Sequence, residues 1–247
     1  MIISHDYPFV NKNSVYAQTS CMQKRYIPIA VFFVVILMIL AHFSGRALAV
    51  PASFTYAQEK EVYLTFDDGP SNSVTVPILD TLREENVKAT FFIVSDRAHG
   101  RETILKRMAD EGHTLGVHSA THEYKKIYAS RESLLKDIDT CAAFIHKTTG
   151  VTPSVYRFPG GSSWHKELRE TVKSHGYRIV DWNAVCGDEE IKNANAETLL
   201  KTTVETSKGK AKVVLLMHDS APRKATAAAL KNIISYFKEH GYAFRAF

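Results

Sequence analysis

The sequence predicts an α/β protein, built as a distorted (β/α)7-type barrel and preceded by a hydrophobic N-terminal segment. From about residue 61 onward, short apolar runs rich in Val, Ile, Leu and Phe alternate with amphipathic segments of helical period. This alternation is typical of parallel strands joined by crossover helices, and seven strands in succession favour a closed or nearly closed barrel over a small open sheet. Polar clusters follow several of the apolar runs, as expected where a barrel carries its chemistry at the strand ends.

The predicted strands are apolar and bounded by turn residues: 62–66, 89–94, 113–117, 155–158, 178–182, 212–217 and 242–247. The predicted helices carry an apolar stripe: 74–85, 102–111, 131–148, 165–175, 196–207 and 225–240. Together they form one predicted domain, residues 61–247.

A hydrophobic segment at residues 27–43 contains no Asp, Glu, Lys or Arg and follows Lys24 and Arg25. Its length lies between the core of a signal peptide, about 7–15 residues, and a transmembrane helix of about 20 residues. Cleavage near Ala49 and retention as a membrane anchor both remain open. Either outcome predicts a cytoplasmic segment 1–26, a linker 44–60 and an extracytoplasmic domain, because the positive charges precede the apolar segment.

Composition is that of an ordinary globular protein, with 247 residues, of which 45% are hydrophobic and 23% charged. The net charge of +5 favours an anionic surface such as a cell wall, but no basic run supports nucleic acid as a partner. Three cysteines are too few for a disulfide framework. Cys141 and Cys186 could pair in an oxidising space, although Cys141 lies in an amphipathic helix, where a buried free thiol is the usual role.

Two adjacent carboxylates, Asp67 and Asp68, end the first predicted strand and precede Gly69 and Pro70. Neighbouring carboxylates repel each other, so a fold that keeps them compensates the pair with a cation or with a proton at an unusual pKa. The alternative is an ordinary turn, since Asp, Gly and Pro all favour turns.

His118 and His122 are four residues apart, a spacing that places both imidazoles on one side of a helical turn. With one Asp they predict a divalent metal site of three ligands and open positions. Zinc is the expected ion for an Asp-His-His set, while cobalt, nickel and manganese also suit it. Further polar clusters near Arg157, Trp182 and His218 come at the ends of later predicted strands, so the barrel brings them to the same edge.

These motifs resemble those of the NodB-type polysaccharide deacetylases, the family 4 carbohydrate esterases, over residues 61–247. The sequence T-F-D-D-G-P at 65–70 and H-S-x-x-H at 118–122 match the first two family motifs. R-x-P followed by glycine at 157–160 and L-x-H at 216–218 match the third and fifth.

The fourth motif departs from the family pattern. The family commonly has a strand Trp, an Asp three positions later, and Asp-Trp at six and seven, whereas Trp182 here is followed by Val185, Asp188 and Glu189. An alternative alignment makes Asp181 and Trp182 themselves the Asp-Trp pair. The first alignment is favoured because it lets Trp182 end the fifth strand.

The resemblance implies that Asp68, His118 and His122 hold the metal. It also implies that Asp67 is the general base, oriented by Arg157. Both the metal ligands and the general base are assigned from the roles that residues of the first three motifs have in the family.

For the remaining positions, the resemblance implies an oxyanion donor at the Gly160 N–H after Pro159, and a general acid at His218. Asp188 would keep that imidazole protonated, and Leu216 and Trp182 would line the pocket for the acetyl group.

The predicted function is therefore metal-dependent hydrolysis of N-acetyl groups from an amino-sugar polymer of the cell wall, with peptidoglycan expected and acetate released. One alternative is an esterase that removes O-acetyl groups from a xylan-like polymer. Another is a glycan-binding module with weak or no turnover, suggested by the altered fourth motif.

Overall fold

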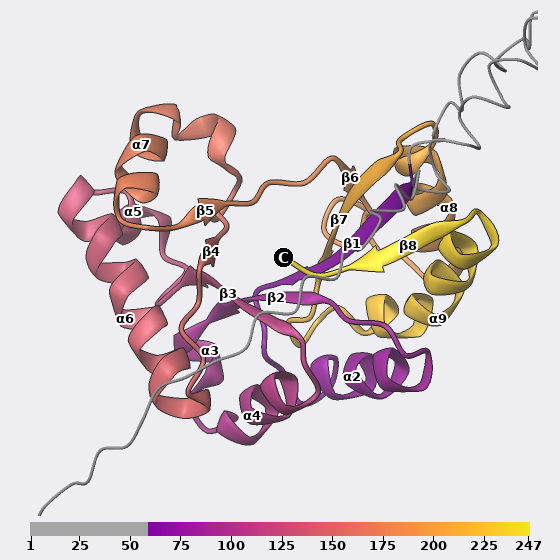
Figure 1. The fold of residues 1–247 in the computed structure, drawn as a ribbon, viewed down its shortest axis with the longest axis horizontal. Coiled ribbons are helices and arrows are strands. Elements are labelled where there is room, and N and C mark those ends of the chain that lie inside the picture. Colours follow the sequence, from indigo (N-terminus) through magenta and orange to yellow (C-terminus); the bar gives the residue numbers. More distant parts are fainter. Residues whose placement is uncertain (1–58) are drawn as a thin grey trace, which may run out of the picture. The chain divides into compact units, whose positions relative to one another are not determined.

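A single parallel sheet forms the centre of the fold and curves into a half-barrel (Figure 1). The computed structural model describes residues 59–247, and in this part of the chain the strand order is β5-β4-β3-β2-β1-β7-β6, with β8 beside β1. The strands are β1 Lys60–Asp67, β2 Thr90–Val94, β3 Thr114–Ser119, β4 Val155–Tyr156, β5 Arg178–Ile179, β6 Ala184–Val185, β7 Lys212–His218 and β8 Tyr242–Arg245. The predicted α/β barrel class is confirmed.

Helices cover the outer face of the sheet, with α2, α4 and α9 on one flank and α5, α6 and α7 on another (Figure 1). Their bounds are α2 Thr75–Glu84, α3 Ser95–Ala98, α4 Glu102–Asp110, α5 Tyr124–Ile127, α6 Arg131–Thr149, α7 Lys166–Ser174, α8 Ala196–Ser207 and α9 Lys224–Glu239, with a 3-10 turn η1 at Ser162–Trp164. Helix α6 is capped at its start by Ser130, whose hydroxyl accepts a hydrogen bond from the Ser133 N–H, and at its end by Gly150 in a left-handed conformation.

Strand β1 is the central strand and sets the register of the site. It pairs with β7 along its length, from Glu61 opposite Lys212 to Asp67 opposite His218. Its other edge is shared, because β8 pairs with its first half and β2 with its second. The register therefore puts Asp67 and His218 side by side at the carboxyl end of the sheet.

Alternation along the strands separates two apolar layers. Val62, Leu64 and Phe66 of β1 point outward into the main core between sheet and helices. A smaller cluster, which includes Phe92 and Val214, fills the inner face. Full burial of a side chain of this size contributes about 1.5–3 kcal/mol, so the outer layer accounts for much of the stability of the sheet.

The half-barrel is open between β5 and β6, which do not pair in the described residues. The predicted strand 178–182 is too long, because β5 ends at Ile179 and the chain then crosses the opening toward β7. Asn183 already donates its backbone N–H to Val214 O on the far side. Trp182 therefore lies between two strands instead of ending one, and β6 directly after it was not predicted. β4 likewise ends at Tyr156, short of the predicted residue 158.

The short helices α3 and α5 and the turn η1 were not predicted, since four residues or fewer carry no periodic pattern. The predicted segments 1–26 and 27–43, and most of the linker 44–60, lie outside the described residues. Among residues 59–247 no helix is long and apolar enough to span a membrane. Cys141 and Cys186 are both buried and, within the described part of the chain, neither forms a disulfide.

Gly116 on β3 gives a test of the tight inner face. A Cβ at this position would lie 2.7 Å from the Phe92 ring and 2.9 Å from Val155 Cγ2. We expect Gly116→Ala to lower the free energy of unfolding by about 1–3 kcal/mol through overpacking, measured by urea denaturation. The loss should be smaller in a Phe92→Leu background, where space has been made. Equal losses in both backgrounds would contradict this account.

Candidate active site

Asp67 lies buried at the end of β1 and forms an ion pair with Arg157, with 2.7 Å between Oδ1 and Nη1. The Arg157 side chain is completely buried and also donates to Thr65 Oγ1 and to Val180 O. Burial lowers the pKa of this guanidinium, while the charge of Asp67 opposes that effect. The result is a carboxylate held in one orientation by a cation on the inner face of the sheet.

Asp68 follows in a left-handed conformation, with φ of 76°. Successive side chains of a strand point to opposite faces, and this break in the strand lets both carboxylates line the same cavity. The next residue must be glycine, because a Cβ at position 69 would collide with the buried carboxylate of Asp219. Asp219 is itself fixed by a hydrogen bond from Thr75 Oγ1.

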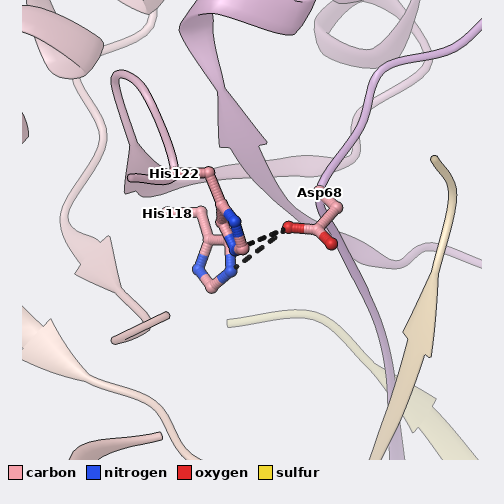
Figure 2. Close-up of side chains that lie close together, drawn as sticks. All are labelled: Asp68, His118 and His122. Carbon is pink, nitrogen blue, oxygen red and sulfur yellow. Dashed lines mark ion pairs between the residues drawn. The ribbon is translucent and has the colours of Figure 1, made fainter. Parts of the chain in front are cut away.

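Asp68, His118 and His122 converge on one point, and Figure 2 shows the two imidazoles directed at the carboxylate. Asp68 Oδ1 lies 3.0 Å from His122 Nε2 and 3.6 Å from His118 Nε2. One ligand atom from each residue lies within 4.8 Å of the others. In the described part of the chain, no other group of three or more His, Cys, Asp or Glu side chains is close enough together to hold a metal ion.

The donor set fits a divalent metal. His118 Nδ1 lies 2.8 Å from Arg157 O, so Nδ1 donates and Nε2 keeps its lone pair for a metal. Burial lowers the pKa of His118, which favours the neutral imidazole that metals require. Burial alone would raise the pKa of Asp68, but the nearby His122, His118 and Arg97 hold it well below its usual range. Asp68 Oδ1 is also buried, and it has no hydrogen-bond donor among residues 59–247.

The loop after β3 brings His122 to the site by a different route from the one predicted. His118 belongs to strand β3 and His122 has a left-handed backbone with φ of 61°, so the two residues do not share a helical turn. Ser119 Oγ accepts the His122 N–H at 2.8 Å, which tightens the loop.

Asp137 on α6 anchors this loop from behind, and sequence reasoning missed it. Its carboxylate accepts hydrogen bonds from Ser119 Oγ and Ala120 N at 2.8 and 2.9 Å and from Thr121 N at 3.3 Å. The available signal was an Asp on the buried stripe of an amphipathic helix, where an ionised side chain needs a partner.

His218 stands beside the metal triad and is paired with Asp188. The Nδ1 atom of His218 lies 2.8 Å from Asp188 Oδ1. The backbone N–H of His218 and the hydroxyl of Thr226 both donate hydrogen bonds to Asp188 Oδ2. Burial would lower the pKa of His218, but the bond and charge of Asp188 outweigh it and raise the pKa to about 9. The structure thus places Asp188 against the imidazole, whereas Asp181 binds the Ser162 N–H instead.

A cavity of about 190 Å³ joins these groups. Of the residues predicted for the site, those that line it are Asp67, Asp68, His118, His122, Gly160, Trp182, Leu216 and His218. Three lie behind its wall: Arg157, Asp188 and Pro159, whose carbonyl accepts the Tyr128 hydroxyl. Tyr124, Glu189 and Glu190 also line the cavity and were not predicted as site residues.

Comparison with known proteins identifies the class. A family profile described as polysaccharide deacetylase matches residues 55–180. The chain therefore belongs to the polysaccharide deacetylase family, a class of hydrolytic enzymes, as the motifs indicated.

Individual relatives point the same way. The chain is 36% identical over 191 residues to the putative polysaccharide deacetylase YheN of Bacillus subtilis, covering 75% of this chain and 66% of that protein. It is 33% identical over 202 residues to a peptidoglycan-N-acetylglucosamine deacetylase of Bacillus cereus, covering 80% and 72%. The catalytic domain of a peptidoglycan N-acetylglucosamine deacetylase from Eubacterium rectale superposes with a TM-score of 0.71 at 31% identity, covering 81% of this chain and 93% of that one.

The Asp137 anchor predicts an effect on metal affinity. In Asp137→Asn the amide N–H₂ faces backbone donors that need an acceptor, so the His122 loop loosens and affinity for zinc or cobalt should fall about 10–100-fold. Competition with a chelating dye measures this, and thermal unfolding checks that the variant is folded. Asp139→Asn, on the exposed side of the same helix, is the matched control. A folded variant with unchanged affinity would show that Asp137 does not position the loop.

The His218–Asp188 pair predicts a pH dependence. Because the folded pKa of about 9 exceeds the ordinary 6.5, the pair stabilises the fold fully below pH 6.5 and loses this contribution as the pH rises through about 9. In Asp188→Asn the hydrogen bond and the charge of Asp188, which raise the His218 pKa most, are lost, so this pKa should fall well below 9. NMR titration of the His218 imidazole in metal-free protein measures its pKa in the unmodified protein and in the variant. Glu189→Gln, which removes only a half-exposed neighbour of Nε2, should shift the pKa less.

Proposed function

We propose that this chain is a metal-dependent deacetylase that hydrolyses N-acetyl groups of an amino-sugar polymer of the cell wall, with peptidoglycan as the substrate. The observation that carries the proposal is the set of groups in one cavity. A carboxylate paired with a buried arginine and an imidazole with a raised pKa flank a triad of metal-ligand type. Amide hydrolysis needs both a base that takes a proton from the attacking water and an acid that protonates the leaving amine.

Asp68, His118 and His122 would hold the divalent ion. Zinc is the expected metal for this donor set, and cobalt, nickel or manganese would also suit it. When bound, such an ion polarises the amide carbonyl and lowers the pKa of water from 15.7 toward about 7.

Asp67 would accept the proton of the attacking water. It is suited to this because Arg157 occupies Oδ1, while Oδ2 lies 3.9 Å from His118 Nε2, toward the metal triad. Its position next to Asp68 lets it reach a water at that point without being a ligand itself.

His218 would protonate the departing sugar nitrogen. Its raised pKa keeps the imidazole charged near neutral pH, and Asp188 on Nδ1 leaves Nε2 as the donor toward the cavity. The Gly160 N–H would donate to the developing oxyanion. Leu216 and Trp182, in the cavity wall, would contact the acetyl methyl.

The substrate assignment rests on relatives whose names specify peptidoglycan N-acetylglucosamine, and on the positive net charge of the chain. We also propose that the domain works outside the cytoplasmic membrane, either tethered by residues 27–43 or released by cleavage near Ala49. The apolar character of that segment is the support for this placement.

Acetate release tests the function. Purified protein with zinc or cobalt should release acetate from peptidoglycan or N-acetylglucosamine oligomers, and a chelator should abolish it. Asp67→Asn should reduce kcat about 10²–10⁴-fold while leaving metal affinity in place, since general base catalysis contributes that range. Asp80→Asn, a surface carboxylate on α2, is the control.

Ester substrates separate the alternatives. Release from O-acetylated xylan with none from amides would replace the proposal by an O-acetyl esterase. Binding to the polymer without acetate from any substrate, in folded and metal-loaded protein, would replace it by a glycan-binding module.

A further inference from the structure

A second and larger cavity adjoins the metal triad. It measures about 640 Å³ and shares Asp68, His122 and Glu189 with the catalytic cavity, so the two are neighbouring parts of one surface. Arg97 of α3, Arg101 directly before α4 and Arg223 directly before α9 line it. These three residues define what we call the arginine groove. The catalytic roles described above involve none of them.

The arginines differ in how well the protein compensates them. Arg97 is engaged by Asp68, donating to its carbonyl and lying 3.2 Å from its carboxylate. Arg101 makes one hydrogen bond, to the Arg97 carbonyl, and no ion pair among the described residues. Arg223 meets a carboxylate only at 3.8 Å, at Glu189. In this part of the chain, Nε of both Arg101 and Arg223 has no acceptor.

Three acids also line the groove and equal the arginines in number, but among residues 59–247 none of them forms an ion pair with Arg101. Asp68 belongs to the metal triad, and Glu189 lies closer to His218 Nε2, at 3.3 Å, than to Arg223. Asp96 is exposed and makes no ion pair among residues 59–247. A bound divalent ion would add further positive charge at the shared wall. Two guanidinium groups, each with a planar fork of donors, therefore face one cavity beside the reacting centre, the arrangement that recognises carboxylates.

We propose that the arginine groove binds a carboxylate carried by the polymer next to the acetylated sugar, such as that of a lactyl or peptide substituent. This inference rests on the proposed function and makes it narrower. The preferred substrate is an acidic, substituted amino-sugar polymer, and neutral oligomers of the same sugar bind without the contribution of Arg101 and Arg223. Arg97 remains paired with Asp68 and forms part of the groove wall.

The test compares the unmodified protein with a double variant on an acidic and on a neutral substrate. In Arg101→Gln/Arg223→Gln, kcat/KM for soluble peptidoglycan fragments with free carboxylates should fall about tenfold or more, through KM, and kcat/KM for neutral N-acetylglucosamine oligomers should not change. Amidation of the fragment carboxylates should cause a similar loss with the unmodified protein. Arg83→Gln, an exposed arginine of α2, is the matched control. Equal losses on both substrates, or no loss on either, would overturn the proposal.

A binding measurement separates this inference from the function itself. Calorimetry of the acidic fragment with metal-free protein should show weaker binding in the double variant and with added salt, since screening reduces contacts between exposed charges. If no acetate is released from any substrate but this difference persists, the groove stands and the deacetylase function falls. If the acidic and amidated fragments bind equally, the groove proposal falls. If the double variant binds more weakly only to polymer that retains phosphodiester chains, the groove recognises phosphate, and the proposal of a carboxylate ligand is wrong.

Discussion

The buried pair of Arg157 and Asp67 is the constraint on which the rest of the site depends. A guanidinium without solvent exposure costs several kcal/mol unless it is paired and hydrogen-bonded, and here its partners lie on β1 and just beyond β5 of an open half-barrel. The side chain reaches Asp67 on β1 and Val180 beyond β5, and the carbonyl of the same residue fixes the His118 imidazole. One residue thus orients Asp67, sets the tautomer of His118 and reaches toward the open edge of the sheet.

Two neighbouring groups at the carboxyl end of the sheet are paired with partners of opposite charge. Asp67 and His218 are register partners on adjacent strands, yet one is paired with an arginine and the other with a carboxylate. The pairing with Asp188 raises the pKa of His218 to about 9 and so favours an imidazolium that can donate a proton. In the proposed reaction, Asp67 would accept a proton and His218 would donate one within the same cavity.

The altered fourth motif changes the character of the cavity mouth. Glu189 occupies the position where the family commonly has Trp, and its half-exposed carboxylate lies between His218 and Arg223. An apolar wall is therefore replaced by a charge that connects the catalytic cavity to the arginine groove.

The α/β barrel class, the family and most residues of the cavity could be predicted from the sequence, because strand periodicity and short motifs such as T-F-D-D-G-P are local properties of the chain. The sequence also pointed to Asp188, but for the wrong reason, since Trp182 does not end a strand. The open edge between β5 and β6, the support of the His122 loop by Asp137, and the arginine groove became visible in the folded chain alone. These features join segments far apart in the sequence through side-chain contacts, and no spacing rule records which distant partner a buried charge will find.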